Sequence, residues 1–318
     1  MESRCLQKFE LHYFFSDDSH SMDALVRNDC ERELLALFKE CSEILGIKCN
    51  VESEAFSEGG LKEVWNFLGT PQVALVVAVL ALVMSRYPPT DSERNAADEK
   101  LLELQTEEAR LNIEKLKLEL KKLKEDKENQ EALEIISDEV VKSSKVLVRR
   151  SNFYEKAIRY EKISNVSYTH LNFENIPVSP SINIDRDAFR FFIIYSKALK
   201  PINIEDAEIE IVSPVLKAGN YKWKGIYEDE VITFAMSDGD FRYQVQSKQV
   251  AFQNGSTITC VLEIQRKLDE TGEIVITGYA VTTVIGKYDS TQSLQTPQGK
   301  AYKQAKKYAE SQQDLFGK

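Results

Sequence analysis

The chain has 318 residues, enough for about two domains with a core each. Hydrophobic residues make up 42% and charged residues 29%, with only 13 glycines and 8 prolines, which excludes the disordered, collagen-like and multi-span membrane classes. The net charge of −10 argues against general binding to double-stranded DNA, because phosphate binding needs clustered lysine and arginine.

The cysteines and histidines give no sign of a metal site. The five cysteines include no Cys-x-x-Cys pair, and only three histidines are present. No zinc or haem spacing results, so the sequence predicts no metal and no cofactor. The cysteines are typical of a reducing cytoplasm. The first ten residues, MESRCLQKFE, contain no apolar run behind a basic segment, which argues against a cleavable secretory signal.

Residues 1–63 are predicted to form a small α/β module of strand, helix and strand. Residues 8–16 (KFELHYFFS) are typical of a strand, and residues 22–45 carry apolar side chains at helical spacing. Residues 47–56 return as a second strand. A new helix is predicted to start after Gly60 and to continue into the apolar stretch that follows.

Residues 64–87 form the most apolar stretch of the chain. Its first 21 residues, VWNFLGTPQVALVVAVLALVM, carry no charge, and Trp65 and Tyr87 lie near its two ends. A helix of this length would span ~30 Å, the thickness of a hydrocarbon core, and the two rings fit interfacial anchoring. These features predict one transmembrane helix. The alternative is a shorter buried helix over residues 73–84, since Pro71 can divide the stretch.

Small and polar side chains in this stretch predict how several such helices would pack. The small side chains recur at spacings of four, three and four residues and are Ala74, Ala78, Ala81 and Ser85. Such a stripe lets helices approach closely in lipid. The strongly polar side chains are Asn66, Thr70 and Gln72. In a bundle of spans they would face the interior or a pore.

Residues 90–162 are predicted to form a helical stalk or hairpin. An a/d seam of apolar residues runs over three heptads between Leu102 and Leu123, which predicts a coiled coil and self-association. Residues 124–130 (KEDKENQ) have no apolar side chain. The chain either folds back there as a hairpin, which we favour, or continues as one long helix, since no glycine or proline forces a turn.

Residues 163–290 are predicted to form a β-rich binding domain. Short strand-forming runs, among them residues 240–246 and 249–253, are separated by Asp-Gly and Asn-Gly pairs, which indicates antiparallel hairpins that close as a barrel or sandwich. Residues 291–318 are predicted to form a C-terminal helix or tail. The predicted fold class is α+β, with an N-terminal strand-helix-strand module, one apolar transmembrane helix, a long coiled-coil stalk and a C-terminal antiparallel β barrel or sandwich.

One hairpin of this domain interleaves basic and aromatic side chains, which could pair a phosphate and stack a base. Its candidate ligand-binding residues are Lys217, Tyr221, Lys222, Trp223, Lys224 and Tyr227. A second basic cluster lies where the helical region meets the β-rich domain and contains Lys145, Arg149 and Arg150. The alternative is structural, because strand alternation would turn the three aromatic rings of the first set into a core and leave its lysines in water.

No catalytic motif is present, so the sequence predicts no catalytic residue and no enzyme. One enzymatic alternative is a metal-dependent nuclease, because phosphodiester cleavage uses Mg²⁺ held by carboxylates together with a lysine. Its candidate residues are Asp206, Glu208, Glu210, Glu263 and Lys267. Alternating glutamates are more typical of the solvated face of a strand.

The Glu-Gly-Gly-Leu element at residues 58–61, followed by an apolar helix, resembles small effector-associated modules of bacterial conflict systems. The order of domains is similar to that of transmembrane effector subunits of anti-phage defence. The resemblance covers residues 1–90 and, by layout, residues 163–290. It implies a partner enzyme that makes a nucleotide or oligonucleotide ligand.

Together these features predict a non-enzymatic, membrane-associated effector of bacterial antiviral defence. It would form a homo-oligomer and permeabilise the membrane, as an ion channel does, when its C-terminal domain binds a ligand. Arg86, Arg94 and Lys100 follow the apolar stretch, which predicts an inner-membrane protein with a cytoplasmic C-terminal domain. A cytoplasmic homo-oligomeric coiled-coil scaffold with a β-rich binding domain is the second interpretation, and the nuclease is the third.

Overall fold

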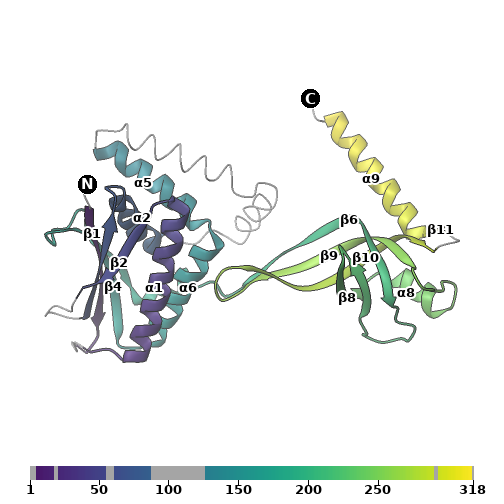
Figure 1. Ribbon diagram of the computed structural model, residues 1–318, viewed down its shortest axis with the longest axis horizontal. Coiled ribbons are helices and arrows are strands. Elements are labelled where there is room, and N and C mark those ends of the chain that lie inside the picture. Colours follow the sequence, from purple (N-terminus) through teal and green to yellow (C-terminus); the bar gives the residue numbers. More distant parts are fainter. Residues whose placement is uncertain (1–4, 18–20, 55–60, 87–125, 290–292, 317–318) are drawn as a thin grey trace. The chain divides into compact units, whose positions relative to one another are not determined.

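The fold is taken from a computed structural model that describes residues 5–17, 21–54, 61–86, 126–289 and 293–316. The chain divides into two compact units (Figure 1). Unit 1 contains Met1–Lys197 and Leu268–Glu273, and unit 2 contains Ala198–Lys267 and Ile274–Lys318. Each unit is described here by itself.

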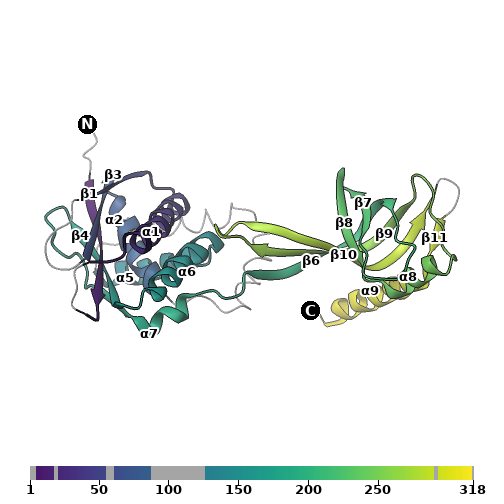
Figure 2. The same ribbon diagram turned by 90° about the horizontal axis from the view of Figure 1, so that it is seen from below.

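Unit 1 is built on a five-stranded antiparallel sheet with the order β2-β3-β1-β4-β5. The strands are β1 (Cys5–Phe15), β2 (Cys49–Ser53), β3 (Leu61–Gly69), β4 (Ile163–Asn172) and β5 (Ile182–Asp185). Its main helices lie on one face of the sheet (Figure 2) and are α1 (Ala24–Leu45), α2 (Val73–Ser85), α5 (Asp126–Val141) and α6 (Ser144–Arg159). The short helices α7 (Arg186–Phe189) and η1 (Arg190–Phe192) follow β5.

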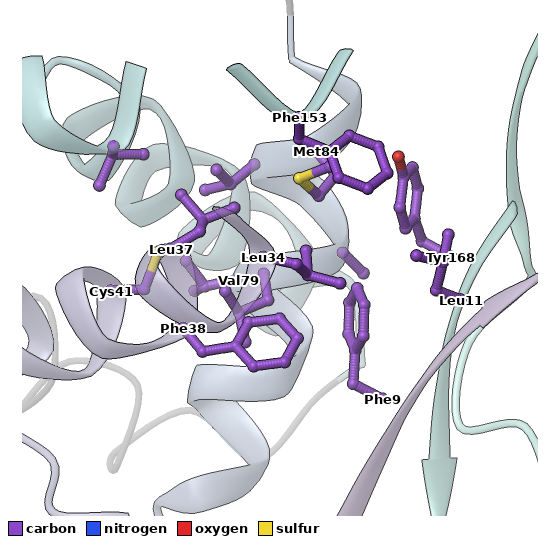
Figure 3. Packing of buried hydrophobic residues seen from close by; sticks show 14 of the residues in the cluster. Phe9, Leu11, Leu34, Leu37, Phe38, Cys41, Val79, Met84, Phe153 and Tyr168 are labelled. Atoms are coloured by element: carbon purple, nitrogen blue, oxygen red, sulfur yellow. The ribbon is translucent and has the colours of Figure 1, made fainter. Parts of the chain in front are cut away.

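The core of unit 1 follows from the alternation of β1. Phe9, Leu11 and Tyr13 point toward the helices and are at most 1% exposed, whereas the residues between them face the other side of the sheet. Figure 3 shows Phe9 packed beside Phe38 of α1 and near Val79 of α2. The two phenylalanine rings lie edge to face with their centroids 5.2 Å apart. One sheet face and several helix faces thus share a single apolar core.

The stretch predicted to cross a membrane is divided between a strand and a buried helix. Its first part belongs to β3, because Trp65 and Phe67 alternate into the core. The chain then turns at Gly69, where a Cβ atom would lie 2.9 Å from the Lys48 carbonyl oxygen, so a larger residue would not fit. No helix among the described residues is long and apolar enough to cross a membrane.

Helix α2 shows why the apolar composition misled the sequence argument. It has 13 residues, so it is only ~20 Å long, and eight of its side chains are buried in unit 1. It packs on α5 and α1 and on strands of the sheet, and a helix enclosed in this way is apolar all round. The transmembrane prediction is therefore wrong, and the buried-helix alternative describes this segment.

The small and polar side chains assigned to helix packing in lipid lie elsewhere. Ala81 is buried, Ala74, Ala78 and Ser85 are half-buried, and the Ser85 hydroxyl donates to the Leu82 carbonyl at 2.9 Å. These residues belong to the packing of α2 within unit 1.

The three polar side chains do not share a helix. Asn66 lies in β3, and Thr70 and Gln72 lie in the turn before α2, where the Thr70 hydroxyl donates to Gln72 Oε1 at 3.3 Å. The pore prediction is wrong because a strand and a turn replace the first half of the expected helix.

The long coiled-coil stalk is also absent from the described residues. The heptad seam from Leu102 to Leu123 lies outside them. The rest of the predicted stalk forms α5 and α6, two helices of 16 residues that pack against each other and against α2 and α1. The helices are interrupted at Lys142 and Ser143, where the backbone of Ser143 is extended, whereas residues 126–130 are helical. Neither residue is a glycine or proline, and the break separates α5, which packs mainly on α2, from α6, which packs mainly on α1.

Glu63 is a carboxylate buried under the helices. It lies in β3 opposite Leu11, its side chain is 2% exposed, and Arg27 Nε donates to it. Burial raises the pKa of Glu63 to about 7, although Arg27 lowers it in part. The folded chain therefore binds one proton more than the unfolded chain between the ordinary pKa of 4.5 and about 7.

Because the folded pKa of Glu63 is raised, its contribution to stability is complete below pH 4.5 and is lost as the pH rises through about 7. We expect this group to lower the free energy of unfolding by about 3 kcal/mol between pH 5 and pH 8. Glu63→Gln cannot titrate, so its free energy of unfolding should fall less over this range. Urea unfolding of both proteins at the two pH values measures the difference, and an equal pH dependence would contradict the assignment.

Unit 2 is a closed five-stranded barrel with the order β6-β7-β8-β10-β9, in which β9 also pairs with β6. The strands are β6 (Ala198–Ser213), β7 (Trp223–Tyr227), β8 (Glu230–Met236), β9 (Thr257–Leu268) and β10 (Ile274–Tyr288), and β11 (Ser293–Gln295) adds to β10. Helix α8 (Gly239–Gln246) lies between β8 and β9, and α9 (Pro297–Phe316) ends the chain. Three consecutive antiparallel strands followed by a fourth beside the first make a Greek key.

The barrel corrects the predicted antiparallel topology in three places. β10 pairs with β8 in parallel, with Tyr279 opposite Phe234. Residues 240–246, predicted as a strand, form α8, because the Asp238 side chain accepts a hydrogen bond from the Phe241 amide and caps the helix. Residues 249–253 form no strand. The helix and the crossover between β8 and β9 allow the barrel to close.

Candidate functional site

Strand β7 carries the candidate residues of the barrel and alternates between its core and its outer face. Trp223 is 1% exposed, and its ring centroid lies 5.4 Å from that of Phe252 and 6.2 Å from that of Phe241. It is a core residue, as the structural alternative has it. Lys222 and Lys224 are exposed, and Lys224 lies opposite Thr233 of β8.

Gly225 brings β7 close to β6. A Cβ atom at this position would lie 2.5 Å from Ile209 Cγ2 and 2.8 Å from the Glu210 carbonyl oxygen, closer than side-chain atoms approach one another. The glycine therefore permits the close approach of the paired strands β6 and β7.

Tyr227 ends the strand and is half-buried. Burial and the neighbouring Glu228 raise the pKa of its hydroxyl to about 12, so the phenol stays protonated at neutral pH. Because Trp223 is buried and Tyr227 is half-buried, neither ring is as open to stacking by a base as the ring of Tyr221. Tyr221 is 59% exposed.

The loop before β7 carries the exposed aromatic ring. A Cβ atom on Gly219, whose φ is +140°, would lie 2.6 Å from Tyr221 Cε2, so the glycine lets this ring lie against the loop backbone. The Lys217 carbonyl accepts a hydrogen bond from Gln246 of α8 at 3.5 Å, which ties the loop to the barrel. The ring and the start of β7 thus have a fixed support.

Three lysines lie close to Tyr221 in the chain, in the loop and at the start of β7. Lys217, Lys222 and Lys224 are exposed, and none has a carboxylate within 4 Å in the described part of the chain. The acidic residues Glu228 and Asp229 lie at the turn at the opposite end of β7. Positive charge is therefore confined to the end of β7 near Tyr221. We call Lys217, Tyr221, Lys222, Lys224 and Thr233 the β7 face.

The second basic cluster is used inside unit 1. Lys145 Nζ lies 2.6 Å from a Glu273 oxygen, and Arg149 Nη1 lies 3.2 Å from Glu33 Oε2. Arg150 is fully buried and donates to the Val83 carbonyl oxygen at 2.7 Å and to the Arg86 carbonyl oxygen. These three side chains hold α6 to α1, to α2 and to the Leu268–Glu273 turn, which groups with unit 1.

The nuclease residues do not converge on a metal site. Glu208 and Glu210 are exposed on β6, and Glu263 lies on β9 opposite Asn203. Among the described residues no group of three histidine, cysteine or acidic side chains could hold a metal ion. The geometry thus gives no support to hydrolysis assisted by a metal held by this chain.

Sequence reasoning missed the contribution of β8 to the β7 face. The run EVITFAM alternates, with Ile232 and Phe234 buried and Val231 and Thr233 exposed. That period of two is a sufficient signal for which side chains face outward, whereas the pairing of Thr233 with Lys224 depends on the register of the hairpin.

The strand order defines the class of the barrel. A five-stranded Greek-key barrel is the architecture of the OB-fold, whose second and third strands and whose first loop bind oligonucleotides or oligosaccharides. In unit 2 these positions are β7, β8 and residues 214–222. No protein family matches the chain, and no curated protein or solved structure is significantly similar to it. A binding function therefore has to be argued from the side chains.

Proposed function

We propose that unit 2 binds a short single-stranded oligonucleotide on the β7 face. The observation that carries the proposal is a set of three exposed lysines, without ion-pair partners among the described residues, next to the exposed Tyr221 in the loop and at the start of β7. Barrels of this architecture bind oligonucleotides at this position. Lysines contact phosphates, and an aromatic ring stacks on a base of any identity. The nucleotide or oligonucleotide ligand, the partner enzyme that makes it and the homo-oligomer stay predictions.

The charge distribution supports a short ligand. Three lysines give about three phosphate contacts, so the slope of log K against log salt for a single strand is expected near −2. The acidic turn at Glu228 and Asp229 disfavours a strand that continues along the whole of β7. Tyr221 has one ring to stack a base, and Thr233 offers a hydroxyl beside Lys224.

Fluorescence anisotropy with labelled oligonucleotides of about six bases, oligo(dT), oligo(rU) and oligo(rA), tests the proposal. We expect saturable binding that the double variant Lys222→Glu/Lys224→Glu weakens by more than about tenfold, and Tyr221→Ala by about tenfold. The matched control is Lys303→Glu/Lys307→Glu, which makes the same charge change on exposed residues of α9 and should leave affinity unchanged. Absence of saturable binding at low salt, or equal weakening by both double variants, would refute the proposal.

A further inference from the structure

Unit 1 contains a cavity of about 780 Å³ on the face of the sheet opposite the helices. Its floor consists of outward side chains of β1, β3, β4 and β5, and its wall consists of residues 175–181. The volume lies within the range of pockets that bind small molecules, roughly 300–1,000 Å³. Nothing in the sequence singled out this face, because its residues are spread along the chain from Glu10 to Asn183.

The wall of the cavity is held in place by specific contacts. The Thr169 hydroxyl donates to the Ser181 hydroxyl at 3.0 Å, and Lys8 Nζ donates to Asn175 Oδ1 at 2.7 Å. The Val178 amide donates to the His170 carbonyl oxygen at 2.8 Å. The cavity therefore has its shape before a ligand binds, which lowers the entropic cost of binding.

One row of polar side chains crosses the floor. The register places Lys62 opposite His12, His12 opposite Ser167, and Ser167 opposite Asn183. Because neighbouring strands lie ~4.8 Å apart, the row is ~14 Å long. Four strands that are distant in sequence thus each contribute one hydrogen-bonding group at the same level.

Most of this row has hydrogen-bonding capacity left over. Ser167 is 4% exposed and lines the cavity, and its hydroxyl has no hydrogen-bond partner in the described part of the chain. The same holds, within those residues, for the His12 ring nitrogens and the Asn183 amide. These groups face the cavity, so they are free to exchange hydrogen bonds with a ligand that supplies the matching donors and acceptors.

The charged side chains at the cavity are paired with side chains of opposite charge. Lys62 Nζ lies 3.5 Å from a Glu10 oxygen, and Lys8 Nζ lies 3.0 Å from a Glu54 oxygen. Burial, and then Lys62, lowers the pKa of His12, so the imidazole is neutral at pH 7. Among the described residues that line the cavity, no uncompensated charge remains to select a phosphate or a carboxylate.

An apolar surface adjoins the polar row. The Phe14 ring lies against the His12 ring with centroids 3.9 Å apart, and Val64 and Leu171 line the same cavity. Apolar side chains beside hydroxyl and amide groups suit a ring that presents C–H bonds on its face and hydroxyls on its edge.

We propose that this cavity binds an uncharged polyhydroxylated ring compound, either a neutral sugar or the ribosyl part of a nucleoside. His12, Ser167 and Asn183 exchange hydrogen bonds with the ligand hydroxyls, the Glu10–Lys62 pair borders them, and the ring face rests on Phe14. The site lies wholly in unit 1 and shares no residue with the β7 face, so it stands or falls independently of oligonucleotide binding.

Saturation-transfer difference NMR on the full chain tests the proposal with two mixtures. One contains glucose, galactose, mannose, N-acetylglucosamine, maltose and trehalose, and the other contains adenosine, guanosine, cytidine and uridine. We expect signal from at least one compound, with affinity at least about tenfold lower in Asn183→Ala and in Ser167→Ala. The mixture that gives the signal tells whether the source is a sugar or a nucleoside.

Asn50→Ala is the matched control. Asn50 lies on the edge strand β2, opposite Leu68 of β3, whereas Asn183 lies on the other edge strand, β5. Asn50 is exposed on the same face of the sheet as the cavity but does not line it. This variant and Lys222→Glu/Lys224→Glu should retain the signal, and thermal unfolding checks that exposed Asn183→Ala remains folded. Absence of signal from both mixtures, or a signal that Asn183→Ala leaves unchanged, would overturn the proposal.

Discussion

Val79→Asp is expected to unfold unit 1. Val79 is 0% exposed in the middle of α2, in the core shared with Phe9 and Phe38 (Figure 3). An ionised carboxylate in such a core costs several kcal/mol, and loss of the valine side chain adds about 2 kcal/mol. The sum, at least about 5 kcal/mol, is comparable to the whole stability of a domain. Far-UV circular dichroism and limited proteolysis of the full chain measure the effect.

The control for this substitution is Leu25→Asp. Leu25 is an apolar residue near the start of α1 that is 78% exposed, so the same kind of change removes little buried surface and places a negative charge at a helix N-terminus. We expect a change in the free energy of unfolding of less than about 0.5 kcal/mol. A folded Val79→Asp protein with an unchanged melting temperature would show that α2 is not a core helix.

Arg150→Ala is expected to lower the free energy of unfolding by about 3 kcal/mol. The guanidinium donates to the Val83 and Arg86 carbonyl oxygens, at and just beyond the end of α2, where helix carbonyls lack partners within the helix. Its carbon Cζ also lies 5.5 Å from the centroid of the Phe192 ring. Removal leaves buried carbonyl groups unpaired and opens a cavity.

Urea unfolding measures this loss against Arg159→Ala. Arg159 lies on the same helix, its side chain is 71% exposed, and it pairs only with Glu155 one turn away among the contacts of the described chain. Such a pair contributes about 0.3–0.5 kcal/mol, so the control should lose less than 1 kcal/mol. Equal losses in the two variants would contradict the capping role of Arg150. Burial also lowers the pKa of Arg150 to about 10, which leaves it charged at neutral pH.

The helix α2 also shows how far composition can lead. The sequence shows an uncharged stretch, and both a membrane and a protein core accept such a stretch. The length of the helix separates the membrane alternative from the core alternative. A strand and a turn take up the first nine residues of the stretch, which leaves a helix of 13 residues. The decisive residues are Trp65 and Phe67, whose alternation with a period of two was present in the sequence but was read as helix.

The candidate sites differ in how much of each could be predicted from the sequence. The β7 face was predicted from its interleaved lysine and tyrosine residues, which are neighbours in the chain. The alternation that buries Trp223 was also predicted, as the structural alternative. By contrast, Arg149 and Arg150 were predicted as candidate ligand-binding residues, since the sequence does not show that Glu33 and the end of α2 lie against them.

Local patterns in the sequence determined the strand character of β1, the helix character of α1, the turns at Asn254-Gly255 and Asp269–Gly272, and the exposure of the β7 lysines. These features depend on neighbours within a few residues, where propensity and alternation act directly. Only the tertiary structure decided that α2 is a core helix, that β10 joins β8 in parallel, and that Lys62, His12, Ser167 and Asn183 form one row. Such pairings are set by burial and register between strands that are far apart in the chain, and no local signal encodes them.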